Sequence, residues 1–253
     1  MTYDYIGSRG SLAAQFDRLS RSDPRPERPA TIIDACTPNQ EQLREAALQS
    51  LGRGNTGQVV LITPLHTRNG GPGPRIAYRK TILDLEEALV DVASDSLTIV
   101  RASRLIEDFA PDLDWATRFG VLCHVEGLIS QPMLTASDAA TAVASALDRP
   151  PRRAPHHWTV WGPTVATSEL ARRCSTNEIP VTLQSMSPGE LVSVMTDSGV
   201  PALAAERIVD AQRLAAQGGL GTNDITELLE HEPAEPLTVL ETVLAHDQKD
   251  QLI

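Results

Sequence analysis

Continuous apolar runs alternate with helical patterns in the first half of the chain. Residues 30–35 (ATIIDA), 57–65 (GQVVLITPL) and 96–102 (SLTIVRA) are rich in aliphatic and β-branched residues, which predicts buried strands. Between these runs, residues 41–52 and 78–93 place apolar residues three and four positions apart, as an amphipathic helix requires. Strands that alternate with helices predict a parallel sheet with helices on both faces.

The second half of the chain is dominated by helical patterns. A helix is predicted over 136–147, and a strand over 157–161 ends at Gly162-Pro163. Further helices with Ser, Asn or Pro start signals are predicted over 168–174, 187–198, 201–217 and 223–229, with a last one over 236–245. We therefore expect a reduced α/β core over 1–163 and a helical C-terminal subdomain over 164–253.

Composition narrows the classes of partner and compartment. The 253 residues include 22 Lys and Arg against 33 Asp and Glu, so the net charge is -11. Nucleic acid and anionic membrane surfaces need a basic face, so we expect a small-molecule ligand instead. Three widely spaced cysteines without a CxxC pair are typical of reduced thiols. No signal peptide and no apolar run of about 20 residues is seen, so we expect a cytoplasmic protein.

Several segments of the second half resemble one known family. They are SLTIVRASRLIEDF (96–109), TASDAATAVASAL (135–147), WTVWGPTVATSELARRC (158–174) and SMSPGELVSVMTDSGVP (185–201). In their order and spacing they resemble the NmrA-like branch of the atypical short-chain dehydrogenase/reductases. Arg101 stands at the family's Arg, while Ala102 replaces its Pro and Asp108 replaces its Asn.

The resemblance implies a Rossmann-like parallel sheet that binds NADP or NAD along its carboxyl edge. A substrate pocket would lie under the mostly helical C-terminal portion. A complete family member has three strands with their helices before the strand placed here at Ala30, and each βαβ unit needs roughly 30 residues or more. Only residues 1–29 are available, so we expect a truncated and degenerate sheet that lacks about two strands.

The nucleotide-binding signals are incomplete. Gly7 and Gly10 form a GxxGxxA pattern before a helical segment, which indicates either a remnant phosphate loop or a structural turn. No strand is available for the ribose-binding residue about 20 positions later. The resemblance also implies a catalytic Tyr with a Lys four residues later; Tyr78 fits the Tyr, but Ile82 replaces the Lys. We therefore predict a protein without a cofactor, with NADP binding as the alternative.

Ligands of open parallel sheets bind beyond the carboxyl ends of the strands, and this rule nominates the catalytic candidates. Thr63 and His66 follow the strand at 57–62, and Tyr78 begins the next helix. His124 and Glu126 lie in the apolar piece FGVLCHVEGL, where desolvation would move both pKa values toward neutrality. Each candidate also has a structural alternative. His66 would lie in a solvated loop, Tyr78 would pack in the core, and His124 and Glu126 would form a buried ion pair.

Substrate-binding candidates follow from the same rule and from aromatic content. Arg101 would hold a substrate oxygen or, alternatively, pair with Glu107 or Asp108. The other candidates are the neighbouring hydroxyl and three aromatic side chains that would form an apolar wall: Ser103, Trp115, Phe119 and Trp161. Neither HxxxH nor HExxH occurs, so we expect no metal.

These signals favour a non-redox enzyme on a degenerate dehydrogenase fold. Acid-base groups and pocket shape would catalyse a cyclisation, isomerisation or dehydration of a bulky apolar intermediate of secondary metabolism. Two alternatives remain. One is a cofactor-sensing or protein-binding regulator of the NmrA type. The other is an NADPH-dependent reductase completed by a second subunit, because a shortened sheet leaves an edge strand that favours a homodimer.

Overall fold

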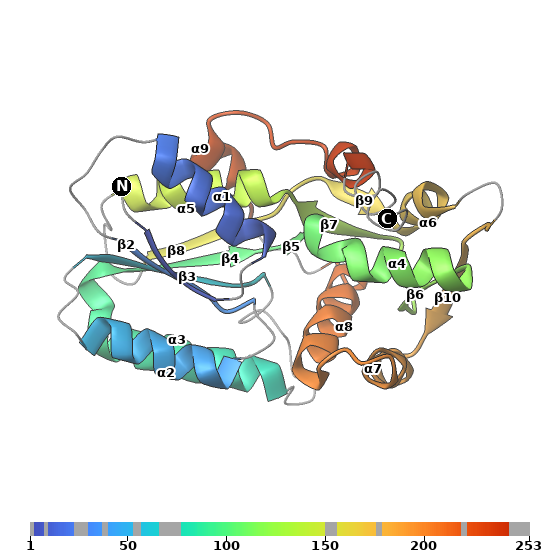
Figure 1. The fold of residues 1–253 in the computed structure, drawn as a ribbon, viewed down its shortest axis with the longest axis horizontal. Helices are drawn as coiled ribbons and strands as arrows, with labels where there is room; N and C mark the ends of the chain where they lie inside the picture. Colours follow the sequence, from blue (N-terminus) through green and yellow to red (C-terminus); the bar gives the residue numbers. More distant parts are fainter. Residues whose placement is uncertain are drawn as a thin grey trace, which may run out of the picture.

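The fold was analysed in a computed structural model, which describes residues 3–7, 10–22, 30–36, 40–52, 57–65, 77–149, 156–175, 179–218 and 222–242. Five parallel strands form the central sheet. In their order across the sheet they are β1 (Tyr3–Ile6), β2 (Ala30–Asp34), β3 (Gln58–Pro64), β4 (Leu97–Ala102) and β8 (His156–Val160). The predicted α/β fold with a parallel sheet is confirmed (Figure 1).

The apolar runs of the sequence form the buried strands of this sheet. Every residue of β2 and β4 is buried, as expected for strands covered on both faces. Ile33 pairs with Leu61, and Leu61 pairs with Ile99, so one apolar row crosses three strands. This row packs under the helices of one face, which explains why the strands carry no polar alternation.

Helices cover both faces of the sheet (Figure 1). Helices α1 (Ser11–Ser22) and α5 (Ala136–Asp148) pack on one face. Helices α2 (Gln40–Gly52) and α3 (Ala77–Ala93) pack on the other. The side chain of Thr135 caps α5 by accepting a hydrogen bond from the Asp138 backbone N–H at 3.1 Å.

The strands of the central sheet follow one another in chain order, so each connection moves in the same direction. If all connections were right-handed, their helices would all lie on one face. Instead, α1 and α5 lie opposite α2 and α3. The β1–α1–β2 connection therefore has the opposite hand to the β2–α2–β3 connection that follows it.

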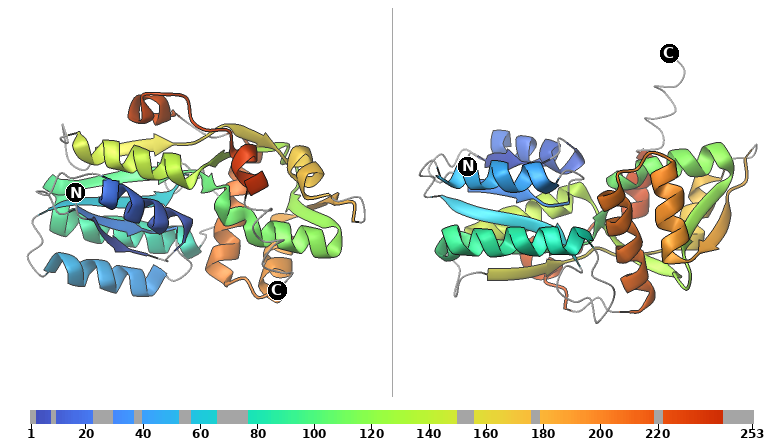
Figure 2. Two further views of the ribbon diagram at one scale, coloured as in Figure 1. Left: turned by 45° about the horizontal axis from the view of Figure 1, so that its top comes forward. Right: turned by 90° about the horizontal axis from the view of Figure 1, so that it is seen from below.

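A second lobe extends beyond the carboxyl edge of the sheet (Figure 2). Its strands are β5 (Arg104–Leu105), β6 (Val121–Val125), β7 (Ser130–Leu134), β9 (Thr164–Ala166) and β10 (Thr182–Met186). Its helices are α4 (Ala110–Phe119), α6 (Thr167–Cys174), α7 (Pro188–Asp197) and α8 (Ala202–Ala216). Strands β6 and β10 pair in parallel, while β7 pairs with β5 and β9. Helix α9 (Ile225–Leu229) instead packs beside α5 on the core.

The lobe differs from the expected helical subdomain in two respects. It includes strands, and residues 104–134 contribute to it, so it draws on both sides of the expected boundary at 163. Strand β10 is not predicted from the sequence, because its residues are mostly exposed and show no alternation of apolar and polar positions. Helices α7 and α8 lie where they were predicted, and Ser187 begins α7 with a capping box to Glu190.

Candidate functional site

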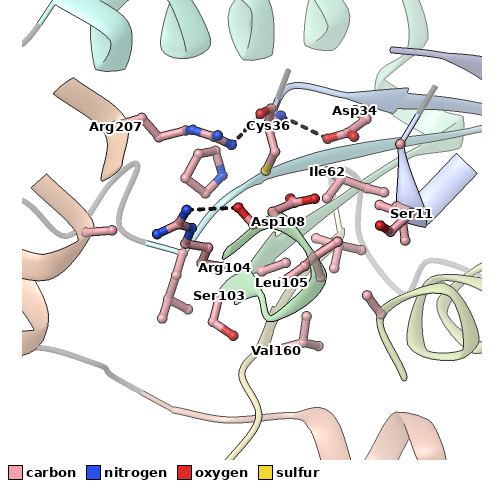
Figure 3. Close-up of a pocket in the computed structure, with 18 of the residues that line it drawn as sticks. Ser11, Asp34, Cys36, Ile62, Ser103, Arg104, Leu105, Asp108, Val160 and Arg207 are labelled. Atoms are coloured by element: carbon pink, nitrogen blue, oxygen red, sulfur yellow. Dashed lines mark hydrogen bonds between the residues drawn. The ribbon is translucent and has the colours of Figure 1, made fainter. Parts of the chain in front are cut away.

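A cavity opens where the strands of the central sheet end (Figure 3). The carboxyl ends of β1 to β4 contribute Tyr5, Asp34, Cys36, Pro64 and Ser103 to its walls. Gly10, which directly precedes α1, and Ser11, the first residue of that helix, lie on one side. The cavity thus occupies the position at which open parallel sheets bind their ligands.

Two glycines shape the turn from β1 into α1. A Cβ at Gly7 would lie 2.9 Å from the Asp34 Cβ and 3.2 Å from the Tyr5 ring, so the backbone needs glycine there. Gly10 begins α1, because its carbonyl accepts a hydrogen bond from the Ala14 N–H at 3.2 Å. The first turn of α1 carries no acidic residue, so its free N–H groups present a partial positive charge to the cavity.

The wall next to this turn is a closed hydrogen-bond network. The Tyr5 hydroxyl donates to Asp34 Oδ2 at 2.7 Å, and the Cys36 N–H donates to Asp34 Oδ1 at 2.9 Å. Burial, and then the charge of Asp34, raise the pKa of the Cys36 thiol and of the Tyr5 hydroxyl. Both groups therefore stay neutral near pH 7, and neither is activated as a nucleophile.

A second cavity lies in the lobe, between α4, β6, α7 and α8. Trp115 and Phe119 line it from α4, with ring centroids 4.2 Å apart. The opposite walls are mainly aliphatic and consist of Leu122, Leu191, Val194, Met195, Val200 and Ala204 among others. An aromatic pair facing aliphatic side chains suits a planar, apolar ligand.

The two cavities share one wall, formed by Arg104, Asp108, Arg207 and Ile208. Arg104 Nη2 donates to the Asp108 carbonyl at 2.9 Å and pairs with the Asp112 carboxylate. Its Nε and Nη1 are buried and have no hydrogen-bond partner among the described residues. Arg207 donates to the Cys36 carbonyl (Figure 3). Unused donors of Arg104 at this junction are a reason to expect a bound acceptor, since buried polar groups are normally paired.

Two more polar groups belong to this region, the Asp108 carboxyl in the shared wall and Ser103 beside it. Burial raises the pKa of the Asp108 carboxyl, while the charges of Arg104 and Arg207 act in the opposite direction. Ser103 lines the first cavity, and its hydroxyl is buried without a partner in the described part of the chain. The junction therefore combines unused donors with a carboxyl group that holds its proton more tightly than usual.

The structure brings some of the nominated residues to these cavities. Gly10 and Ser103 line the first, and Trp115 and Phe119 line the second. Gly7 supports the same turn, although it does not line the cavity.

Tyr78 and Arg101 lie away from both cavities. Tyr78 is fully buried in the first turn of α3 and donates to Asp210 at 2.6 Å, and burial followed by this carboxylate raises its pKa. Arg101 pairs with Glu86 at 3.1 Å and contacts His157 Nδ1 at 2.9 Å. The expected alternative partners of Arg101, Glu107 and Asp108, are therefore corrected to Glu86, a residue of α3 that packing alone brings to it.

Four more candidates, which the structure describes, also line neither cavity. His124 is in β6 with its Nδ1 3.0 Å from the Val125 carbonyl, and Glu126 is exposed just after that strand. Thr63 is buried in β3. The Trp161 indole N–H donates to the Thr222 carbonyl at 3.3 Å, which holds the ring against the segment before α9. His66 lies outside the described residues.

Sequence reasoning missed several residues of the walls. Asp34 and Cys36 follow a predicted strand, so the carboxyl-edge rule would have nominated them. Asp108 was considered as a replacement within the family pattern and as a partner of Arg101, but not as a site residue. Arg207 lies in the middle of α8 and carries no local signal. Within the described ranges, no group of three or more His, Cys, Asp or Glu is placed to hold a metal ion, and no helix there is long and apolar enough to cross a membrane.

Comparisons with known proteins identify the fold. No protein-family model matches the sequence, and no curated protein matches it either. Among solved structures, an NADPH-dependent quinone oxidoreductase from Escherichia coli, complexed with NADPH, matches with a TM-score of 0.70 and 15% identity over 96% of this chain and 100% of that one. A nucleoside-diphosphate-sugar epimerase from Staphylococcus aureus matches with a TM-score of 0.70 and 13% identity, over 95% and 100%.

A third match is the triphenylmethane reductase of Citrobacter sp. complexed with NADP(H), with a TM-score of 0.64 and 16% identity over 96% of this chain and 99% of that one. Two of these three structures hold a nicotinamide dinucleotide, and this finding overturns our expectation of a fold without a cofactor. Our reason was an expected shortening of the sheet, but the structure has the turn at Gly7 and Gly10 and a cavity beside it. The chain therefore shares its fold, a parallel α/β sheet flanked by helices, with these two reductases and this epimerase.

Proposed function

We propose that the protein is an NAD(P)H-dependent reductase of an aromatic, oxygen-bearing substrate such as a quinone. One observation carries this proposal: a cavity at the start of α1 and an aromatic cavity in the lobe share the wall of Arg104, Asp108 and Arg207. Such an arrangement lets a cofactor and a substrate meet at charged groups. The quinone oxidoreductase and the triphenylmethane reductase share this fold, and their activities also support a reductase.

The residues of the first cavity fit a nicotinamide nucleotide. Gly10 and Ser11 would hold phosphate at the start of α1, where a Cβ added at Gly10 would meet none of the described atoms within 4 Å. Ser103, whose buried hydroxyl has no partner among the residues that the structure describes, would hold the nicotinamide ribose or amide, next to Pro64 and Ala102. When bound, the cofactor would supply a hydride.

The residues of the shared wall and the second cavity would act on the substrate. Trp115 and Phe119 would stack on its ring and exclude water. The unused N–H groups of Arg104 would donate to the substrate oxygen and stabilise the negative charge that develops there. Asp108, whose pKa is raised by burial, would in its protonated form donate the proton to that oxygen. Tyr78 has no part in this scheme, since its hydroxyl is committed to Asp210.

We further propose that the chain is a shortened, NmrA-like variant of this fold. The resemblance of residues 96–109 and 158–174 supports the family, and the strand order supports the shortening. Helix α1 lies opposite α2, as it would if β1 and β2 were once separated by further strands.

Calorimetric titration with NADPH tests the cofactor site. A negative charge at the first position of α1 stabilises the helix but repels phosphate, so Ser11→Asp should weaken NADPH binding about tenfold while stability is kept or increased. Ser11→Asn is the matched neutral control and should bind like the parent protein. Because Ser11→Asp should weaken NADPH binding without lowering the stability of the fold, the weaker binding cannot be attributed to unfolding.

Turnover is tested by following NADPH oxidation with a panel of quinones. We expect turnover with at least one of them, and Arg104→Met should reduce it with little change in NADPH affinity. Absence of binding of both NADPH and NADH would refute the proposed function. Unchanged affinity in Ser11→Asp would refute the placement of phosphate at α1.

A further inference from the structure

We infer that this site binds the nicotinamide mononucleotide half of the cofactor and does not read the adenosine half. The protein would then bind NADH, NADPH and reduced nicotinamide mononucleotide (NMNH) with comparable affinity. This inference rests on the proposed function and adds the specificity of the site.

The strand that reads the adenosine ribose is absent from the described sheet. In doubly wound nucleotide-binding sheets the strand order is 3-2-1-4-5-6, and the residue that distinguishes NAD from NADP follows strand 2. Here β1 lies at the edge of the described sheet, and β2 is its neighbour on the other side. Between α1 and β2 the chain has only residues 23–29, whereas a βαβ unit needs roughly 30 residues or more.

The faces of the helices show which strands these are. With right-handed connections, the helix after strand 1 and the helix after strand 4 lie on opposite faces, because the chain reverses its direction across the sheet between them. Helix α1 lies opposite α2 and α3. Strand β1 therefore corresponds to strand 1 and β2 to strand 4, so β2 does not take the place of the strand that carries the adenosine-binding residue.

Asp34 is a candidate for a relocated ribose-binding carboxylate, since it ends β2 a little over 20 residues beyond Gly10. Both of its oxygens are already used. Oδ2 accepts from the Tyr5 hydroxyl at 2.7 Å, and Oδ1 accepts from the Cys36 N–H at 2.9 Å. The carboxylate thus supports the wall of the cavity and is not offered to a ribose hydroxyl.

The other half of the site keeps its donors. Helix α1 has 12 residues and begins at the cavity, and Ser103, only 6% exposed, lines the same cavity and has a buried hydroxyl without a partner among the described residues. A single phosphate at α1 and a ribose or amide near Ser103 account for both features. The adenosine half of a dinucleotide is not needed to give a partner to either the helix N-terminus or Ser103.

Calorimetric competition gives the test, with binding heat and thermal shift as readouts that do not depend on turnover. We expect the Kd values of NADH, NADPH and NMNH to agree within about tenfold, and 2′,5′-ADP at about a millimolar concentration not to displace NADH. Asp34→Asn should leave the ratio of NADH to NADPH affinity unchanged. A relocated ribose carboxylate would instead shift that ratio toward NADPH, because the mutation removes a charge that repels the 2′-phosphate.

Three outcomes would overturn the inference. A preference for one dinucleotide of more than about tenfold, or displacement by 2′,5′-ADP, would show that the adenosine half is read, either by this chain or by a second copy at β1. A ratio that shifts in Asp34→Asn would assign that reading to Asp34. All three leave the proposed reductase intact, whereas no binding of any nicotinamide compound would overturn both proposals.

Discussion

The Tyr78 hydroxyl donates a hydrogen bond to Asp210 across 2.6 Å, and this buried contact joins α3 to α8. Arg79 Nε donates to the same carboxylate at 2.7 Å, and Arg213 Nη2 donates at 2.9 Å. Helix α8 also carries Arg207, which lies in the wall between the two cavities. The residue that the sequence nominates as a catalytic acid therefore holds in place the helix that completes the site.

Replacing the Tyr78 hydroxyl distinguishes a structural role of this residue from a catalytic one. Tyr78→Phe should lower the free energy of unfolding by roughly 1.5–3 kcal/mol, because the lost hydrogen bond is made to a buried charged group. Urea denaturation measures this loss. The Kd for NADPH of the folded variant should stay unchanged. A variant of normal stability that has lost turnover would instead identify Tyr78 as a catalytic residue.

The ion pair between Arg101 and Glu86 gives a second stability prediction. Both side chains are buried, and removing one partner leaves an uncompensated charge. Glu86→Gln should therefore cost about 3–5 kcal/mol in chemical denaturation. Its neighbour Glu87 is exposed, so Glu87→Gln should change stability by no more than about 0.5 kcal/mol. Equal effects of the two mutations would mean that the buried pair contributes nothing specific.

The carboxyl of Asp108 sets the expected pH dependence of turnover. Burial raises its pKa above the ordinary value of 3.8, so the proton is retained to higher pH and is lost as the pH rises through the raised pKa. Because the protonated form is the proposed acid, kcat/KM should fall with rising pH along this limb. Asp108→Asn should abolish the limb and lower kcat while NADPH still binds. A limb that persists in the variant would assign it to another group.

The aromatic pair of the second cavity predicts an effect on substrate affinity alone. Trp115→Ala removes one of two rings whose centroids lie 4.2 Å apart. The KM for an aromatic substrate should rise by about threefold to tenfold, with the Kd for NADPH unchanged. Val92, an exposed residue of α3, lines neither cavity, and Val92→Ala should leave both constants as they were. An equal loss of cofactor affinity in Trp115→Ala would place the ring in the nucleotide site.

The turn after β1 is tested by adding one methyl group. In Gly7→Ala the new Cβ would lie 2.9 Å from the Asp34 Cβ, so the strands β1 and β2 must shift apart. We expect a loss of about 1–3 kcal/mol in the free energy of unfolding, together with weaker NADPH binding. A Cβ added at Gly52, at the end of α2, would meet none of the described atoms within 4 Å, so Gly52→Ala serves as the control and should be tolerated. Full stability of Gly7→Ala would show that the turn does not need glycine.

Much of the fold follows from local patterns in the sequence. The aliphatic runs in 30–35, 57–65 and 96–102 can be buried only as inner strands, and they form β2, β3 and β4. Helices α7 and α8 are recognised because Ser187 and Pro201 mark their starts. Ser103, Trp115 and Phe119 were nominated and line the cavities, because position after a strand and aromatic character are local properties.

Other features depend on contacts between distant parts of the chain. Tyr78 has the residue type of an acid, but Asp210, more than 130 residues away, determines its role. The shared wall combines Arg104 and Asp108 with Arg207, which only the packing of α8 brings to them. The prediction of no cofactor was wrong because counting missing strands says nothing about the turn and cavity that remain.

The sequence by itself determined the inner strands, most helices and the carboxyl edge as the place for a ligand, since periodicity and chain order carry this information. The tertiary structure decided which faces the helices cover and which side chains surround each cavity. The physical reason is that burial and hydrogen bonding between distant residues are set by packing, which no local pattern records.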